Sequence, residues 1–267
     1  MHGGSVSLGI VEAEKDDVPG EGVLSRAFRM LRAYTADDER LTAAELGERS
    51  GLPRSTAHRL ATELASLGVL DRGGDGGYSI GTGLWEIGEL APVSMRLRER
   101  ALPHLLRLYE ASGENVHVAV LSGEDPATAE ALYVARVTGP HSIPTLSRMG
   151  GRHPLHTTGV GKALLAAQDD AWLEVYFRRS LERETVYSIV DEHQLRGDIA
   201  AARERGFAMT RQEMTLGNIS IAATIPAVAD LPLAAVGVVT HLARADERRA
   251  GPLVMAAARD IARALSG

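Results

Sequence analysis

A short stretch near the middle of the sequence has the residues needed to hold a small anion. It runs from Gly151 to Leu164 and reads GRHPLHTTGVGKAL, so small residues surround the expected start of a helix. Backbone N–H groups exposed at a helix N-terminus hold carboxylates and other anions. A Walker phosphate loop is excluded, because His156 stands where its first glycine belongs and Ala163 where its magnesium-binding Ser or Thr belongs. The alternative is a packed turn in which the glycines serve only backbone geometry.

A second set of residues has the chemistry of a DNA-binding surface. The helix expected to start at Leu52-Pro53 has an apolar face made of Ala57, Leu60, Ala61, Leu64 and Leu67. Its other face carries Arg54, Ser55, His58, Arg59 and Thr62, and its first turn, which also holds Thr56, is free to approach a groove edge. Arginine can bond a guanine edge with two hydrogen bonds, and Ser or Thr hydroxyls reach phosphates or bases. The alternative is a solvated helix face, since any surface helix has polar residues outside.

The sequence carries no recognisable catalytic or metal-binding motif. It contains no cysteine, which excludes disulfides, thiolate metal sites and cysteine nucleophiles. His117, His153 and His156 could be grouped as a metal site, or with Glu114 as acid–base machinery. No HExxH, GxSxG or paired-carboxylate motif accompanies them. We therefore expect structural histidines, no catalytic residue, no metal and no cofactor.

The elements around the cationic helix predict a winged helix. Apolar residues recur at helical spacing over 23–36, and Thr42 with Glu45 forms a capping box at the start of a second helix. Gly51 ends that helix and Pro53 opens the third. Two short β segments, 69–72 and 78–80, then flank the tip GGDGG at 73–77, which predicts a hairpin in which Arg72 can meet phosphate.

The rest of the chain predicts a helical connection and then an α+β domain. Residues 84–112 have helical spacing interrupted by Pro92 and Pro103, which predicts two or three consecutive helical segments. Strands are expected at 117–121, 131–135, 143–146, 219–225 and 233–239, and helices at 159–168, 170–179, 191–205 and 246–265. Strands flanked by helices with tight turns predict an antiparallel or mixed sheet.

Composition and charge bound the class of protein. The 267 residues suffice for two domains, and 45% hydrophobic with 24% charged residues is typical of a folded globular protein. The net charge of −6 does not suggest nucleic-acid binding, and residues 21–100 hold eleven arginines against twelve acids. DNA binding would then depend on where the arginines lie and on several modules per complex. No signal peptide or run of about 20 apolar residues is present, so a cytoplasmic protein is expected.

Several stretches together resemble the IclR family of bacterial regulators. They are LTAAEL at 41–46, GLPRSTAHRL at 51–60, and Leu67-Gly68 followed by the Tyr78 hairpin with Gly81 and Leu84. The resemblance extends from about residue 23 to 265. It implies a winged helix-turn-helix domain, connecting helices that join partner subunits, and a GAF-like sheet domain with a pocket on one face. Trp85, Ile87 and Leu90 are then candidate dimer contacts, with core packing as the alternative.

The resemblance also implies a site for a small acid. The family's effector loop presents main-chain donors, which correspond here to Thr158, Gly159 and Val160. Members that bind small oxoacids surround the ligand with an acidic residue, a cysteine and two serines, and the matching residues here are Thr210, Ser220, Gly237 and Val239. Three of these four positions lose hydrogen-bonding strength or volume, which predicts a roomier and less polar pocket. We expect an effector larger or more apolar than glyoxylate, either an aromatic or a branched acid.

The sequence thus predicts an α+β protein with a flexible leader at 1–20, a winged helix-turn-helix domain at 21–83, a helical linker at 84–112 and a GAF-like mixed-sheet domain at 113–267. We expect a transcriptional regulator that binds double-stranded operator DNA as a homodimer or a dimer of dimers, with an affinity that a small organic acid modulates. One alternative is a hydrolase or transferase, for which no nucleophile and base can be assembled. Another is a protein-binding winged helix, in which Arg54 and Arg59 would not affect DNA retention.

Overall fold

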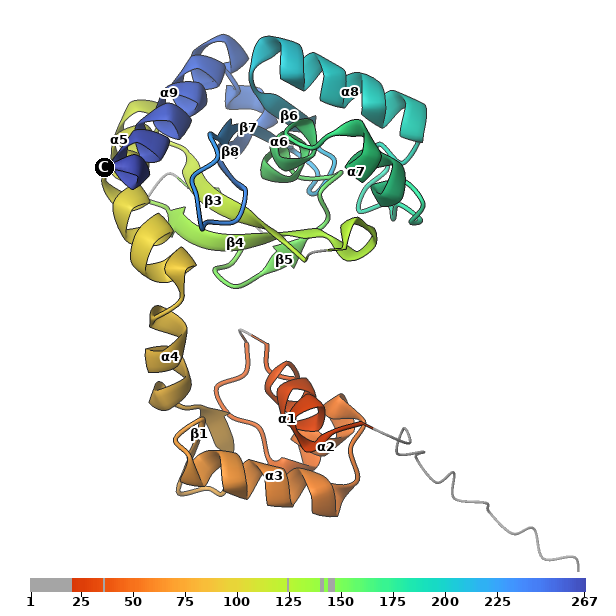
Figure 1. The fold of residues 1–267 in the computed structure, drawn as a ribbon, viewed down its shortest axis with the longest axis vertical. Helices are drawn as coiled ribbons and strands as arrows, with labels where there is room; N and C mark the ends of the chain where they lie inside the picture. The colour runs from red at the N-terminus through yellow and green to blue at the C-terminus, as the bar shows by residue number, and fades with distance from the viewer. Residues whose placement is uncertain (1–20, 36, 124, 140–141, 144–146) are drawn as a thin grey trace, which may run out of the picture. The chain divides into compact units, whose positions relative to one another are not determined.

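The computed structural model describes residues 21–267, apart from 36, 124, 140–141 and 144–146. The expected leader at 1–20 and most of the expected strand at 143–146 lie outside the described residues. The chain divides between Leu90 and Ala91 into two compact units (Figure 1). Each unit has its own hydrophobic core, so the two are described separately.

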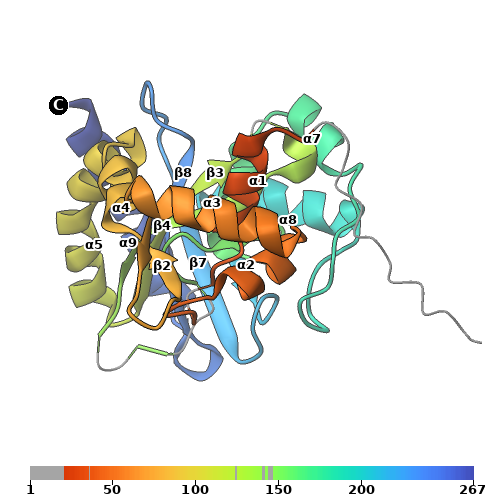
Figure 2. The ribbon, with the colours of Figure 1, turned by 90° about the horizontal axis from the view of Figure 1, so that it is seen from below.

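The first unit is a three-helix core with a hairpin and a further helix. Its elements are α1 (Val23–Leu31), α2 (Ala43–Ser50), α3 (Arg54–Ser66), β1 (Leu70–Arg72), β2 (Tyr78–Ile80) and α4 (Thr82–Glu89). β1 and β2 pair antiparallel, and α2 packs against both α1 and α3 (Figure 2). The core joins these elements through Met30, Leu41, Leu46, Leu52, Ala57, Leu60, Ala61, Leu70 and Tyr78.

Local signals in this unit are confirmed at α2 and differ at two helix ends. The capping box is formed, because Thr42 accepts from the Glu45 amide while the Glu45 carboxylate accepts from the Thr42 amide. α1 ends at Leu31 rather than 36. The Asp38 carboxylate accepts from the amide and hydroxyl of Thr35, which stabilises a turn there instead. Leu67, expected on the buried face of α3, is 68% exposed because it caps the helix where the chain turns away.

The expected helical linker at 84–112 is divided between the two units. α4 belongs to the first unit, whereas a π-helix (Val93–Arg98) continues directly into α5 (Glu99–Ser112) in the second. Contrary to expectation, Pro103 lies inside α5 without breaking it. The helix continues because one face, formed by Leu97, Ala101, Leu105 and Leu108, is buried in the second core. Such packing outweighs the hydrogen bond that proline removes.

The second unit is built around one sheet. Among the described residues, its strands are β3 (Asn115–Ser122), β4 (Glu130–Val137), β5 (Arg152–His153), β6 (Ala208–Arg211), β7 (Asn218–Ile225) and β8 (Ala234–His241). Their order is β5-β4-β3-β8-β7-β6, and every neighbouring pair is antiparallel. The sheet is therefore antiparallel rather than mixed, and the short strands β5 and β6 were not predicted.

Different helices cover the two faces of this sheet (Figure 1). α5 and α9 (Glu247–Ser266) pack on one face, and α6 (Gly159–Ala166), α7 (Asp170–Tyr176) and α8 (Glu192–Arg205) lie on the other. Side chains alternate along each strand, so Val116, Val118 and Val120 of β3 join the core under α5 and α9 while Ala119 joins the core under α6. The anion-holding stretch predicted at 151–164 includes β5 and the start of α6, on the α6 side of the sheet.

Candidate functional site

The predicted DNA-binding residues lie on one helix and one strand of the first unit. Arg54, Ser55, His58 and Arg59 are exposed on α3, and Thr56 is half-buried. Arg59 lies 3.7 Å from the Glu63 carboxylate one turn along the helix. Arg72 is exposed on β1, with its guanidinium carbon 5.8 Å from the centre of the Tyr78 ring. The cationic groups are therefore held at the protein surface while the apolar side of α3 is buried.

The tip of the hairpin is ordered by its own acidic residue. The Asp75 carboxylate accepts from the Gly77 amide at 3.1 Å and lies 3.4 Å from Nη1 of Arg40. The hydrogen bond from Gly77 is the main reason why the pKa of Asp75 is lowered, and Arg40 adds to the effect. Arg40 was not predicted to lie near this hairpin, because it is 35 residues away from Asp75 in the sequence.

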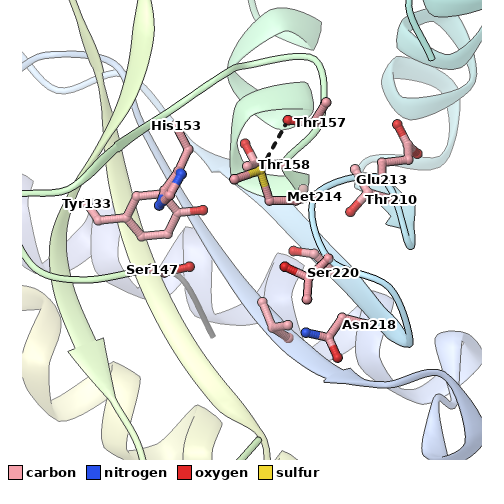
Figure 3. Close-up of a pocket in the computed structure, with 13 residues that line it drawn as sticks. Tyr133, Ser147, His153, Thr157, Thr158, Thr210, Glu213, Met214, Asn218 and Ser220 are labelled. Carbon is pink, nitrogen blue, oxygen red and sulfur yellow. Dashed lines mark hydrogen bonds between the residues drawn. The ribbon is translucent and has the colours of Figure 1, made fainter. Parts of the chain in front are cut away.

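A pocket of the second unit lies between the start of α6 and the sheet. It encloses about 440 Å³ of empty space including its open mouth. Tyr133, Ser147 and His153 lie on one side, and Thr210, Asn218 and Ser220 lie on the other (Figure 3). Its remaining lining residues come from the start of α6, the β6–β7 turn and β8: Thr157, Thr158, Gly159, Glu213, Met214, Thr215 and Val239.

The start of α6 forms one wall of this pocket as predicted from its small residues. Thr158 is the N-cap, and its hydroxyl accepts from the Gly161 amide at 3.1 Å and donates to the Pro154 carbonyl at 3.0 Å. The other amides of the first turn have no intrahelical acceptor. A Cβ at Gly159 would lie 2.3 Å from Oγ of Ser220, so glycine is required for the helix to approach the sheet this closely.

The opposite wall is a row of residues across three neighbouring strands. Thr210 of β6 pairs in register with Ser220 of β7, and Ser220 pairs with Val239 of β8. Residues opposite one another in adjacent strands point to the same face of a sheet. This register explains why residues separated by up to 29 positions in the sequence line the same cavity.

Five of the seven residues expected to bind the effector line the pocket, and two do not. Thr158, Gly159, Thr210, Ser220 and Val239 are lining residues. Val160 instead points into the core under α6. Gly237 packs against β7, where an added Cβ would lie 2.7 Å from Cβ of Ala222. Neither Val160 nor Gly237 therefore lines the pocket.

The pocket has more polar side chains than the matched positions alone indicated. Among the described residues that line it, only Gly159, Met214 and Val239 lack a polar side chain. The expectation of a pocket less polar than that of relatives that bind small oxoacids stays a prediction. The added polar groups come from residues that sequence reasoning missed. Thr157 lay inside the stretch that signalled the site, whereas nothing local marked Ser147 or Asn218.

Tyr133 is the largest of the missed residues and is held between two imidazoles. Its ring centre lies 5.6 Å from that of His117 and 5.4 Å from that of His153, and both contacts are edge-to-face. Burial raises the pKa of Tyr133 to about 12, while side-chain hydrogen bonds with Ser147 and Thr158 act in the opposite direction. The phenol therefore stays protonated and can donate a hydrogen bond near the start of α6.

A buried ion cluster supports the pocket from behind. Nζ of Lys162, a residue that is 1% exposed, lies 2.7 Å from Oε2 of Glu213 and 2.5 Å from Oδ2 of Asp198. Lys162 belongs to α6, Asp198 to α8 and Glu213 to the pocket wall. Burial raises the pKa of Glu213, and the ammonium of Lys162 opposes that rise. The cluster thus ties three segments around the pocket together.

The histidines considered for metal binding or catalysis are separated by the fold. His117 and His153 flank Tyr133, whereas His156 lies 2.8 Å from the Glu182 carbonyl and 3.5 Å from the Tyr176 hydroxyl. Within the described part of the chain, no group of three or more His, Asp or Glu side chains is placed to hold a metal ion. None of the helices described there is both long and apolar enough to span a bilayer.

A winged helix-turn-helix unit followed by an α+β unit with a pocket defines the class of DNA-binding transcriptional regulators. The family model described as the C-terminal domain of the bacterial transcriptional regulator IclR matches residues 91–267, and the IclR helix-turn-helix model matches residues 23–74. The chain belongs to the IclR family. The predicted family and the α+β fold class are thereby confirmed.

Similar proteins cover nearly the whole chain. It is 30% identical over 249 residues to the transcriptional repressor IclR of Escherichia coli, covering 91% of this chain and 90% of that protein. It is 34% identical over 251 residues to the glycerol operon regulatory protein of Streptomyces coelicolor, covering 91% and 94%. These relatives are regulators rather than enzymes, which removes the basis for the hydrolase or transferase alternative.

Solved structures show the same architecture. An IclR homolog from Microbacterium hydrocarbonoxydans, crystallised with 4-hydroxybenzoate, is 30% identical and matches with a TM-score of 0.83, covering 91% of this chain and 99% of that one. A transcriptional regulator from Rhodococcus is 29% identical and matches with a TM-score of 0.77, covering 91% and 98%.

Proposed function

We propose that this regulator binds operator DNA with α3 and the β1–β2 hairpin, and that a small organic acid in the pocket changes its operator affinity. The convergence of the amides at the α6 start with the hydroxyl of Ser220 supports this role, because such donors suit a carboxylate. A ligand that prefers one arrangement of the protein shifts the population toward it. The acid would in this way act on DNA binding without touching DNA.

The lining favours an aromatic or branched acid over a very small one. Tyr133, Met214 and Val239 provide apolar surface between the polar ends of the pocket. The homolog of similar fold that was crystallised with 4-hydroxybenzoate supports the aromatic choice. Within this pocket we assign Thr158, Gly159, Thr210, Ser220 and Val239 to effector binding.

DNA binding is assigned to the cationic face of the first unit. Arg54, Ser55, Thr56, His58 and Arg59 would face the major groove, and Arg72 would meet phosphate. A homodimer or dimer of dimers would place two copies of α3 at successive major-groove faces. Exposed apolar residues of α4 and of its C-cap are candidate contacts between subunits, namely Trp85, Ile87 and Leu90. The site of action would be the cytoplasm, where bacterial DNA lies.

The DNA assignment is tested by gel shift with the regulator's own upstream region. Replacing Arg54 and Arg59 together with alanine should weaken binding by about 100-fold, since each base contact contributes roughly 1–3 kcal/mol. Arg248→Ala, an exposed arginine of the second unit, is the matched control and should retain wild-type affinity. Equal DNA retention by the double variant would instead support a protein-binding winged helix.

The effector assignment is tested by calorimetry with 4-hydroxybenzoate, benzoate, pyruvate and glyoxylate. We expect saturable binding of the aromatic acids, and an altered gel shift at the same ligand concentrations. Binding of glyoxylate or pyruvate without binding of the bulkier acids would contradict the proposed effector class. Acid binding that left DNA affinity unchanged would contradict the regulatory role of the pocket.

A further inference from the structure

A second cavity lies on the opposite face of the sheet from the pocket described above. It encloses about 410 Å³ including its mouth, between the end of α5, the turn before β3, strand β8 and the start of α9. Its lining residues are Ser112, Glu114, Val238, Thr240, Arg244, Asp246, Arg249, Ala250 and Leu253. Strand β8 separates the two cavities, because Val239 faces the first pocket while Val238 and Thr240 face this one.

The charged groups around the second cavity balance one another. Among the described residues that line it, two carboxylates, those of Glu114 and Asp246, face two guanidinium groups, those of Arg244 and Arg249. The balance disfavours a ligand with a large net charge of either sign, since that charge would meet a like group at the wall. It favours a small molecule that carries both a cationic and an anionic group.

Glu114 supplies an acceptor that the described residues leave unused. Its side chain is 17% exposed, and its Oε2 atom is buried without a hydrogen-bond partner in the described structure. Nη2 of Arg244 forms an ion pair with this oxygen at 3.6 Å, a distance longer than a hydrogen bond. Burying a carboxylate oxygen without a hydrogen-bond partner destabilises the folded protein, and a donor group of a ligand would remove this penalty. An ammonium group makes a charge-assisted hydrogen bond to a carboxylate, which is stronger than a bond from a neutral donor.

Two further groups have hydrogen-bonding capacity toward the cavity. Thr240 is 4% exposed, and the hydrogen bond of its hydroxyl to the His241 carbonyl is 3.5 Å long. Arg249 donates from Nη2 to the Ala111 carbonyl at 2.6 Å, which uses one of the five N–H donors of a guanidinium. The hydroxyl and the remaining donors of Arg249 suit a carboxylate.

Apart from Ser112, whose hydroxyl donates to the Leu108 carbonyl at 2.7 Å, the remaining described residues of the cavity wall are apolar. Val238 is buried, and Ala250 and Leu253 of α9 are partly buried against the same core. A short aliphatic group placed there would be removed from water, which favours binding. A charged or strongly polar substituent would find no partner on this part of the wall.

We propose that this cavity is a second ligand site, which takes a small α-amino acid with an aliphatic side chain. The ammonium group binds Glu114, the carboxylate binds Arg249 with Thr240 at its side, and the side chain packs on Val238, Ala250 and Leu253. The proposal does not depend on the acid site of the first pocket, because no lining residue is shared between the two cavities.

The test is calorimetry on the full chain with L-leucine, 4-methylpentanoate and 3-methylbutylamine. The last two are leucine without its ammonium group and without its carboxylate. We expect leucine to bind at least tenfold more tightly than either fragment, and Glu114→Gln to weaken leucine binding at least tenfold. Glu114→Gln should keep the wild-type melting temperature and the wild-type affinity for an acid that binds the first pocket.

Two controls keep the outcome decisive. Thr240→Val preserves the shape of the cavity and should weaken leucine binding several-fold even if Glu114→Gln folds poorly. Saturating 4-hydroxybenzoate should not displace leucine. The proposal is overturned if leucine shows no saturable binding up to about 10 mM. It is also overturned if 4-methylpentanoate binds as tightly as leucine, if both variants bind leucine normally, or if 4-hydroxybenzoate displaces it.

Discussion

At the scale of single residues, His117 is a buried polar group without hydrogen-bond partners. It is 1% exposed, and neither ring nitrogen has a partner among the described residues. Its contact with the protein interior includes the edge-to-face packing against Tyr133. Burial is the main cause that lowers the pKa of His117 to about 3, and Arg136 and His153 lower it further. The imidazole therefore stays neutral in the folded protein over the physiological pH range.

Replacing His117 with leucine should make the protein less sensitive to acid. In the unfolded chain a histidine has a pKa near 6.5, so below that pH the unfolded state gains a proton that the folded state does not take up. This residue should cost the wild type about 1 kcal/mol of unfolding free energy between pH 7 and 5.5. Urea unfolding at pH 7 and pH 5.5 should show that His117→Leu loses less unfolding free energy than the wild type when the pH is lowered. A loss as large as in the wild type would contradict the neutral, buried imidazole.

A methyl group at Gly159 should close the effector pocket. The Cβ of Gly159→Ala would lie 2.3 Å from Oγ and 2.9 Å from Cβ of Ser220, so either α6 or β7 must move. We expect at least a tenfold loss of acid affinity by calorimetry, together with some loss of stability. Gly197→Ala is the matched control. Its Cβ meets nothing within 4 Å on α8, so it should leave acid binding intact and stabilise the helix by about 0.5–1 kcal/mol.

At the scale of elements, the ion cluster at Lys162 holds α6, α8 and the pocket wall together. The Glu213 backbone carbonyl also accepts from the Ser188 hydroxyl at 2.7 Å, which adds the 185–188 turn to the same wall. Removing one member of a buried ion pair leaves its partner charged in a low-dielectric interior, and this typically costs 3–5 kcal/mol. The pocket wall therefore depends on a cation that does not itself line the pocket.

Lys162→Met should destabilise the second unit by roughly 3–5 kcal/mol. The variant keeps the length of the side chain but leaves Glu213 and Asp198 without their cation. The double variant Lys162→Met with Glu213→Gln should lose less than the sum of the two single changes, because it removes both members of the pair. Chemical unfolding of all three variants measures this coupling. Additive losses would show that the two groups do not interact as the distances indicate.

Elements with strong local signals were predicted well, and those that depend on distant partners were not. The capping box of Thr42 and Glu45 and the left-handed Gly51 are set by neighbours within one turn, so they were readable directly. β5 has only two residues and exists because Ala131 and Leu132 of β4 pair with it. The pocket followed the same rule. The small residues at 158–159 marked it in the sequence, whereas Tyr133 lines it from β4 and Ser147 from the connection between β4 and β5.

At the scale of the whole molecule, the division between the units, between Leu90 and Ala91, lies inside the linker predicted at 84–112. Helical spacing continues through 84–112, and spacing alone does not show which core a helix joins. α5 joins the second core through Ala101, Leu105 and Leu108, whereas Trp85, Ile87 and Leu90 are between 64% and 69% exposed. The predicted linker is therefore one continuous helical pattern in the sequence, but its first part belongs to the first unit and its second part to the core of the second unit.

The exposed side of α4 should contribute to assembly. Tryptophan residues often contribute much of the binding energy of a protein interface. Replacing the exposed Trp85 with a charged residue, Trp85→Glu, should therefore weaken self-association at least tenfold. Sedimentation equilibrium over a range of concentrations measures this. Val186→Glu is the control in the second unit, at a residue that is 79% exposed, and should leave the assembly unchanged. An unaltered dissociation constant for Trp85→Glu would exclude α4 from the subunit contact.

None of the eight residues of α4, all of them described, is buried. Helices shorter than about 12–15 residues are marginal in water without tertiary support, so α4 should open and close repeatedly in an isolated chain. Its amide protons should then exchange with deuterated solvent much faster than those of α5, and their exchange should slow as the protein concentration rises. In the homodimer proposed above, α4 would thus stiffen only upon assembly, and an effect of the pocket on DNA binding that passes through α4 would require that assembly.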